Sequence, residues 1–213
     1  MKGYNTTGWN RLRYNVWSLF YDPVLRLLEP GRRQALEQAA PRPGERILIV
    51  GGGTGLDLPH LQALGAGQAD ILLTDISPAM LDRARRRTAR LGMDSVRIET
   101  MDAQALRLDG GQFDLVILHL ILAVVPDARA TLREAARVLK ADGRISIYDK
   151  FAPDDRPPGL LRRLANVVSE TLATSITRQL GPLLDEAGLE AVVDRPSHFK
   201  GFFRTVLARK RAP

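Results

Sequence analysis

A glycine-rich loop between a short apolar strand and a helix constrains the fold of this chain more than any other feature. Residues 47–50 read Ile-Leu-Ile-Val, and Gly51, Gly53 and Gly55 follow before a helical stretch begins. Asp75 ends the next apolar run, about 20 residues beyond the last of these glycines. In α/β proteins such glycines let the backbone approach a nucleoside, and an acid at this distance accepts hydrogen bonds from ribose hydroxyls. The sequence therefore predicts an α/β fold that binds a nucleoside.

The spacing of the glycines indicates which nucleoside is bound. Dinucleotide sites use G-x-G-x-x-G, which would place a glycine at position 56, where Leu56 stands. A pyrophosphate is held at a helix N-terminus, whereas a ligand without phosphates needs only room and backbone partners. The G-x-G-x-G pattern therefore favours S-adenosylmethionine over NAD.

Composition narrows the class of protein. A chain of 213 residues, 45% of them hydrophobic, is expected to form one domain, or one domain with a cap, around a sizeable core. It has no cysteine and only three scattered histidines, so neither a disulfide framework nor a metal site is predicted. The net charge of +7 is compatible with nucleic acid, an anionic membrane or an arginine-rich proteome. Without a signal peptide or a long apolar segment, we expect a soluble, cytoplasmic protein.

Apolar strands alternate with helices along most of the chain, which predicts βαβ units and a parallel sheet. The link 195–201 between the last two strands is too short for a parallel crossover, so these strands should form an antiparallel hairpin. The fold class predicted is α/β, with a Rossmann-like seven-stranded mixed sheet, parallel except for the last strand, and helices on both faces. Residues 1–43 are expected to form an N-terminal helical cap on the cofactor-binding domain, residues 44–213. The expected strands are 46–50, 71–74, 96–100, 113–118, 144–148, 190–194 and 202–209.

Polar side chains follow four successive predicted strands. Ligands of such sheets bind beyond the carboxyl ends of the strands, so these groups should surround the site. Asp75 could accept from both ribose hydroxyls, and Asp102 from the adenine amino group. Each also has a structural alternative, because Asp75 could favour the helix that Ser77 caps and Asp102 could cap a helix itself. In order along the chain, the four positions are Asp75, Asp102, His119 and Asp149-Lys150.

The chain resembles the class I S-adenosylmethionine-dependent methyltransferases from about residue 10 to its end. The resemblance implies S-adenosyl-L-methionine as cofactor, S-adenosyl-L-homocysteine as product and no metal. It places the three glycines beside the methionine part of the cofactor, Asp75 with Ile76 at the ribose, and Asp102 with Ala103 at the adenine. Ile49 departs from the family, whose members usually carry there an acid that anchors the amino end of the cofactor. The matching segments are 49–55, 74–81, 101–103, 113–116 and 132–140.

Two subgroups of this family share further strings with the chain. Bacterial phosphatidylethanolamine N-methyltransferases resemble it at Tyr21-Asp22, 29–33, 53–59 and 124–127, and ubiquinone/menaquinone C-methyltransferases share Tyr21-Asp22 and the general layout. The expected reaction is methyl transfer to a small-molecule or lipid acceptor, first the amine headgroup of phosphatidylethanolamine. C-methylation of a quinone-like or other small molecule is the alternative. Nucleic-acid methylation and cofactor binding without catalysis are less favoured.

Several residues are candidates for roles at the acceptor. His119 could be a general base, orient the acceptor or touch the cofactor, because histidine titrates near neutrality; a buried structural histidine is the alternative. Tyr14 and Tyr21 could close over the cofactor from the cap, and Tyr14 and Lys150 could bind substrate. The basic, aromatic residues 8–33 predict either peripheral contact with an anionic membrane at the inner face or helices packed on their own domain.

Overall fold

The protein is described by a computed structural model that covers residues 28–152, 178–197 and 202–212. Within these ranges helices and strands alternate along the chain, as the pattern of apolar residues predicts. The elements are α2 (Glu29–Ala39), β1 (Arg46–Val50), α3 (Leu58–Ala63), β2 (Asp70–Asp75), α4 (Pro78–Leu91), β3 (Arg97–Thr100), β4 (Phe113–His119), α5 (Ala128–Val138), β5 (Leu139–Lys150), α7 (Leu180–Glu186), β6 (Leu189–Pro196) and β7 (Phe203–Lys210).

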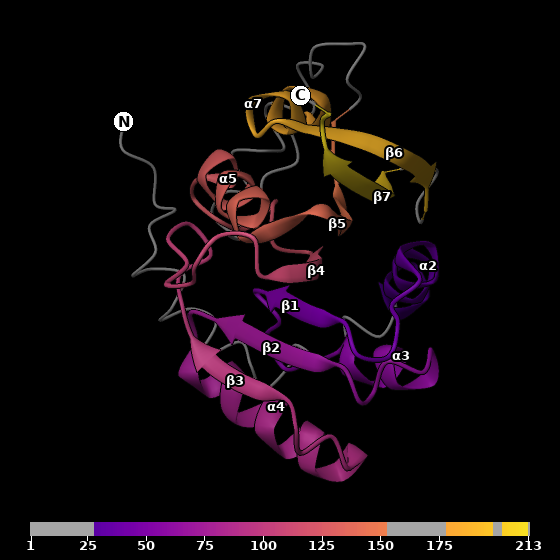
Figure 1. Cartoon of the computed structure of the whole chain (residues 1–213), viewed down its shortest axis with the longest axis vertical. Helices are drawn as coiled ribbons and strands as arrows, with labels where there is room; N and C mark the ends of the chain where they lie inside the picture. The colour runs from indigo at the N-terminus through magenta and orange to yellow at the C-terminus, as the bar shows by residue number, and fades with distance from the viewer. Residues whose placement is uncertain (1–27, 153–177, 198–201, 213) are drawn as a thin grey trace.

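The strands form one seven-stranded sheet in the order β3-β2-β1-β4-β5-β7-β6 (Figure 1). Strands β1 to β5 pair in parallel, and β7 runs antiparallel to both β5 and β6. The predicted fold class, a mixed sheet parallel except for its last strand, is therefore confirmed. The order reverses between β1 and β4, so the carboxyl ends of these two central strands diverge into loops on opposite sides of a crevice.

Two hydrophobic layers sandwich the sheet. Alternate residues of a strand point to opposite faces, and in β1 Leu48 and Val50 pack with α5 and α7, whereas Ile47 and Ile49 pack with α2, α3 and α4. The central strands are buried on both faces, as parallel strands covered by helices should be. Figure 1 shows α5 and α7 on one side of the sheet and α2 and α3 on the other.

Helix α4 begins and ends where the sequence predicts. The hydroxyl of Ser77 accepts a hydrogen bond of 3.3 Å from the backbone N–H of Met80, Pro78 occupies the first turn, and Gly92 adopts the left-handed conformation after the last turn. This start fixes the residue before it as well, because Asp75 lies just two positions upstream of the cap.

Helix α2 has Pro30 in its first turn, where proline is tolerated. One strand begins well before its predicted first residue. The strand predicted at 144–148 is β5, which already begins at Leu139, and Leu139 pairs with Phe113 across a register shift. A bulge absorbs the extra residues, which period-2 patterning does not reveal.

The helices of the described ranges include none that combines the length and apolar character required to cross a membrane. Residues 1–27 of the predicted cap, the proline-rich loop at 153–159 and part of the final hairpin turn lie outside the described residues. Helix α2, the described part of the cap, packs against β5 and β7.

Candidate cofactor site

The glycine loop turns sharply out of β1 toward the crevice. Gly51 and Gly53 have φ angles of 64° and 55°, in the left-handed region that favours glycine. A Cβ atom on Gly51 would lie 2.0 Å from Cδ1 of Ile121, so this glycine is also needed for the close approach of the loop after β4. The loop can therefore offer its backbone to a ligand, as the spacing of the glycines predicts.

Asp75, the last residue of β2, is held by two backbone donors. Its Oδ2 accepts from the N–H of Gly53 and its Oδ1 from the N–H of Ser77, both at 2.9 Å. Burial raises the pKa of this carboxyl, and the backbone hydrogen bonds oppose the rise only in part. Asp75 therefore supports the start of α4 and also lines the crevice in a fixed orientation, and its role at a ribose stays a prediction.

Asp102 follows β3 and has a neighbour that orients it. Its Oδ1 accepts from both the backbone N–H and the side-chain Nε2 of Gln104, each at 2.9 Å. The Oε1 of Gln104 in turn accepts from the N–H of Asp127, the N-cap of α5, at 2.9 Å. Gln104 thus connects the predicted adenine acid to the opposite side of the crevice, a role that sequence reasoning missed.

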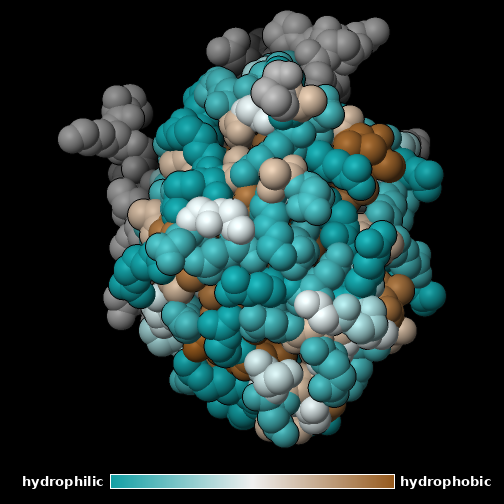
Figure 2. All heavy atoms as spheres, in the orientation of Figure 1, coloured by the Kyte–Doolittle hydropathy of each residue, from teal (hydrophilic) through white to brown (hydrophobic). Residues whose placement is uncertain are grey.

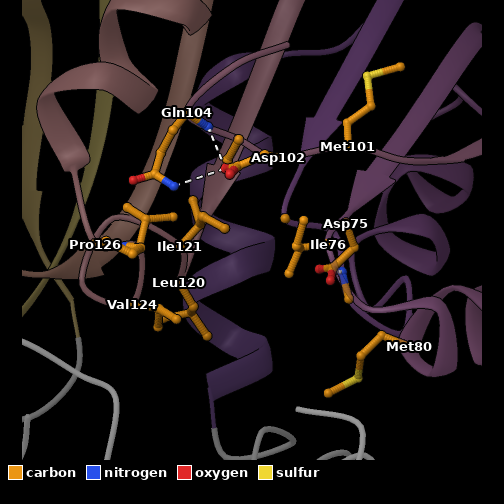
Figure 3. A pocket seen from close by; sticks show the side chains of 14 residues that line it. Asp75, Ile76, Met80, Met101, Asp102, Gln104, Leu120, Ile121, Val124 and Pro126 are labelled. Carbon is orange, nitrogen blue, oxygen red and sulfur yellow. Dashed lines mark hydrogen bonds between the residues drawn. The ribbon is translucent and has the colours of Figure 1, made fainter. Parts of the chain in front are cut away.

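The crevice is a pocket of about 660 Å³, part of it open to solvent. Asp75 and Ile76 lie on one side of it and Leu120 and Ile121 on the other, with Asp102 at one end (Figure 3). Two carboxylates beside a glycine loop, with apolar walls facing each other, suit an adenosine whose hydroxyls and amino group need acceptors and whose ring needs apolar faces. The residues present therefore fit S-adenosylmethionine. The lining comprises Gly51, Gly53, Asp75, Ile76, Met80, Met101, Asp102, Ala103, Gln104, Leu120, Ile121, Val124, Val125 and Pro126.

The wall formed by residues 120–126 is fixed by contacts from β5 and from Arg178. Leu120 has a φ of 61°, a conformation that is costly for leucine, and its N–H donates to the carbonyl of Tyr148 in β5 at 2.7 Å. Asp149 accepts from the N–H of Ala123 at 3.0 Å. The guanidinium of Arg178 donates to the carbonyls of Leu122, Val125 and Pro126. These contacts order the wall without placing their side chains in the pocket.

His119 lies in a buried polar network beside the pocket. Its Nδ1 is 2.7 Å from Oδ1 of Asp57, and the other carboxylate oxygen of Asp57 accepts from Nη1 of Arg32 in α2 at 2.8 Å. Its Nε2 is 3.0 Å from the hydroxyl of Ser146 in β5. Burial alone would raise the pKa of Asp57, but Arg32 and His119 together hold it well below its usual range.

The network engages both ring nitrogens of His119. The ionised Asp57 can only accept, so Nδ1 donates to it. The Ser146 hydroxyl, which also lies 3.2 Å from the carbonyl of Ala35, occupies Nε2. The His119 side chain is 0% exposed and is not among the residues that line the pocket. This arrangement argues against a direct base or cofactor-contact role, which stays a prediction, and favours the structural alternative.

Only some of the other predicted site residues line the pocket. Ile76 and Ala103 line the pocket beside their acids. Lys150 is half-buried at the end of β5, away from the lining residues, and burial lowers its pKa. Tyr14 and Tyr21 lie outside the described residues. The described ranges contain no group of histidine or carboxylate side chains suited to a metal ion.

Comparison with known proteins agrees with this geometry. The family described as "Methyltransferase domain" matches residues 47–143, which include the glycine loop, both acids and the wall after β4. A phosphatidylethanolamine N-methyltransferase of Cereibacter sphaeroides is 28% identical over 93% of this chain and 96% of its own length.

Two other relatives are more similar over shorter stretches. A demethylmenaquinone methyltransferase of Clavibacter sepedonicus is 36% identical over 74% of this chain and 63% of its own length. An aklanonic acid methyltransferase of a Streptomyces species is 31% identical over 72% of this chain and 70% of its own length. The solved structure of a SAM-dependent methyltransferase of Thermotoga maritima superposes with a TM-score of 0.70 at 20% identity, covering 95% of this chain and 100% of that one.

Proposed function

Because the chain belongs to the class I S-adenosylmethionine-dependent methyltransferases, we propose that its methyl acceptor is the amine headgroup of phosphatidylethanolamine. One observation carries the choice of acceptor. The similarity to a phosphatidylethanolamine N-methyltransferase runs over nearly the full length of both chains, whereas the demethylmenaquinone methyltransferase extends well beyond the part that matches. Similarity over nearly the whole length of both chains is what supports this acceptor.

The residues of the pocket have distinct tasks in such a reaction. S-adenosylmethionine would supply, when bound, an electrophilic methyl group on a sulfonium; the acceptor would bond to that methyl in line as its bond to sulfur breaks, and S-adenosylhomocysteine would leave. Asp75 and Asp102 would hold the two ends of the adenosine, and Ile76 and Ile121 would pack on its faces. The glycine loop would keep the methionine part close to the carboxyl end of β4. The protein therefore contributes alignment and exclusion of water, which are the main requirements of a displacement with a good leaving group.

The chemistry of the lining favours an acceptor that is already nucleophilic. Among the described residues that line the pocket, the ionisable side chains are Asp75 and Asp102, which the proposal assigns to the cofactor. A neutral amine attacks without a general base, whereas a hydroxyl or ring carbon usually needs a group that removes its proton. The described lining thus supports N-methylation.

Turnover on lipid vesicles tests the acceptor. Conversion of S-adenosylmethionine to S-adenosylhomocysteine is measured with anionic vesicles that contain phosphatidylethanolamine and with matched vesicles that carry phosphatidylcholine instead. We expect product only with the amine lipid, and none with the Asp75→Ala variant. Equal turnover on both kinds of vesicle, or none on either, would contradict the proposal.

C-methylation of a quinone-like acceptor is the second candidate. It is supported by the higher identity, 36%, of the demethylmenaquinone methyltransferase within the region that matches. This candidate predicts turnover with a reduced, prenylated quinone in detergent micelles and no dependence on phosphatidylethanolamine. The two acceptors can be compared in one assay, because S-adenosylhomocysteine is the product in both.

We also propose that residues 8–33 bring the protein to an anionic membrane surface from the cytoplasmic side. The support is their basic, aromatic sequence and the net charge of +7. Figure 2 shows a largely hydrophilic face with scattered hydrophobic groups, and among the described residues Val192 is the large hydrophobic side chain that is exposed. Replacing Trp17 and Arg13 together should abolish binding to anionic vesicles and leave binding of S-adenosylhomocysteine intact. Unchanged vesicle binding would exclude the proposed membrane contact.

A further inference from the structure

A buried ionic network joins four elements of the fold beside the pocket. Asp57 lies just after the glycine loop, directly before α3, Arg32 comes from α2, His119 ends β4, and Ser146 belongs to β5. Each of the four residues is 5% exposed or less. The contacts between their side chains are 2.7 to 3.0 Å long, so the network fixes the relative positions of these elements closely.

The network touches the chain segments that form both walls of the pocket. Asp57 follows Gly53, which lines one wall, by four positions. His119 directly precedes Leu120 and Ile121, which line the other. The bond of 2.7 Å between Asp57 and His119 therefore ties the end of the glycine loop to the start of the facing wall.

The composition of the network is unfavourable for stability alone. Removing charges from water is costly, and well-packed apolar residues often stabilise a core as well as a buried ion pair does. The compensation here is incomplete, because Nε of Arg32 is buried without a hydrogen-bond partner. Leu120, held beside the network, adds the strain of a positive φ. Buried charges and backbone strain persist where a function requires a fixed geometry. The geometry that this network fixes is the distance between the two walls of the pocket.

We propose that Asp57 is a positioning residue of the cofactor site, which acts through Arg32 and His119 to hold the glycine loop at the spacing that S-adenosylmethionine requires. Asp57 is the buried acid closest along the chain to the glycine loop, whereas Ile49 on the strand before it is buried and apolar. The proposal concerns the cofactor and is independent of which acceptor is methylated.

The Asp57→Asn variant tests this role against a matched control. The change preserves the shape of the side chain but removes its charge and one acceptor. Glu45→Gln makes the same chemical change in an ion pair with Arg144, whose side chains are 12% and 13% exposed. That pair lies at the amino end of β1, beside the middle of β5, rather than at the carboxyl ends of the strands. The dissociation constant of S-adenosylhomocysteine is measured by calorimetry, and the melting temperature of each free protein by scanning fluorimetry.

We expect both variants to lose thermal stability, but only Asp57→Asn to lose cofactor affinity, by about tenfold or more. The KM for S-adenosylmethionine should rise by a similar factor, with a smaller change in kcat, because the network does not contact the acceptor. In a double-mutant cycle, Arg32→Met added to Asp57→Asn should weaken binding little further, since the two residues act through the same ion pair.

An unchanged dissociation constant for Asp57→Asn, or an equal loss of affinity in Glu45→Gln, would overturn the proposal. If Asp57→Asn does not fold, Ser146→Ala removes the outer hydrogen bond to His119, together with the one to the carbonyl of Ala35, and keeps every charge. That variant should show a smaller loss of affinity of the same sign, and no loss at all would count against the network. The measurements of binding and melting temperature need no acceptor, so their failure is distinguishable from failure of the lipid proposal.

Discussion

Gly51 shows how a single residue couples the glycine loop to the facing wall. Its φ of 64° is accessible to glycine at little cost, and its missing side chain leaves the space that Ile121 fills. The two requirements are separate, because a residue can be strained in its backbone without meeting a neighbour. Gly44 illustrates the difference: its φ is 78°, and a Cβ there would meet nothing within 4 Å.

Comparison of Gly51→Ala with Gly44→Ala separates the two requirements. Both changes should destabilise the fold by roughly 1–2 kcal/mol, the cost of a left-handed residue with a side chain. Only Gly51→Ala should also displace Ile121 and weaken S-adenosylhomocysteine binding, by about tenfold or more. Calorimetric titration and urea unfolding of both variants measure the two effects. Equal binding by both variants would mean that the contact with Ile121 is not needed in the complex.

Ribose binding by Asp75 should make the affinity for the cofactor fall at low pH. The ribose hydroxyls would donate to the ionised carboxylate, and burial raises the pKa of this group above 3.8. Affinity for S-adenosylhomocysteine should therefore be constant near neutrality and fall as the pH drops through the raised pKa, by about tenfold per pH unit below it. The Asp75→Asn variant should bind more weakly and without this dependence. A wild-type affinity that stays constant down to about pH 4 would contradict the assignment.

The same shift has the opposite effect on the free protein. Because the pKa of Asp75 is higher in the folded state than in the unfolded chain, the folded state binds the proton more tightly. The contribution of this group to stability is therefore greatest at low pH, and it is lost as the pH rises from 3.8 through the raised pKa. At neutral pH the free protein keeps a carboxylate that burial disfavours, and ribose hydroxyls can compensate for the lost water.

At the scale of elements, the wall of residues 120–126 depends on contacts made from outside the pocket. Arg178 reaches three carbonyl groups of this wall, and Asp149 accepts one of its N–H groups. Unpaired backbone groups in a buried loop are costly, so these two side chains replace the partners that a strand or helix would supply. Arg178, which lies before α7, is thus linked to the cofactor pocket.

Replacement of Arg178 by methionine should release the wall. The change removes the donors to three carbonyls and should weaken binding of S-adenosylhomocysteine by about fivefold to tenfold, with some loss of stability. Arg129→Met is the matched control, because Arg129 pairs with Glu186 on the same side of the sheet, where their side chains are 58% and 45% exposed. A surface pair of this kind contributes about 0–1 kcal/mol, so binding should not change. Calorimetry on both variants provides the comparison.

The sequence predicts these elements well where their signals are local. Strands β1, β2 and β4 are apolar runs, and the start of α4 is set by a cap and a proline within a few residues. The extension of β5 back to Leu139 was not predictable, because residues 140–143 have the composition of a turn. The strand reaches back beyond them because Leu139 pairs with Phe113. Local composition does not record a partner that lies elsewhere in the chain.

The residues of the candidate site were likewise predictable where their signals are local and not where they depend on a distant partner. Asp75 and Asp102 follow predicted strands and line the pocket together. The surroundings of His119 were not predictable, because its partner Asp57 is 62 residues away. One signal was available, since Arg32 shares the buried stripe of α2 with Ala35, Leu36 and Ala39, and an arginine in such a stripe indicates a buried partner.

At the scale of the molecule, the cofactor should stabilise the whole fold. Its proposed contacts come from the loops after β1, β2, β3 and β4, so binding connects most of the parallel half of the sheet (Figure 1). Unfolding must break these contacts together, because the carboxyl ends of the four strands meet at one crevice. A ligand that binds only the folded state then raises the melting temperature by mass action.

S-adenosylhomocysteine at about a hundred times its dissociation constant should stabilise the protein by about 2.7 kcal/mol, which raises the melting temperature by about 5–10 °C for a chain of this size. NAD at the same concentration should give no shift, because the glycine spacing lacks the third position of a dinucleotide site. Scanning fluorimetry with both ligands measures the difference. A shift with NAD alone would contradict the cofactor assignment.

If the pocket recognises the nucleoside part of its cofactor, as proposed, the product of the reaction should inhibit the enzyme. Asp75 and Asp102 are proposed to bind the adenosine part of the cofactor, which is the same before and after methyl transfer. The spent cofactor should therefore occupy the crevice about as readily as the fresh one. The rate of methylation should then depend on the intracellular ratio of S-adenosylmethionine to S-adenosylhomocysteine more than on the concentration of either. An enzyme that removes S-adenosylhomocysteine would therefore increase this rate.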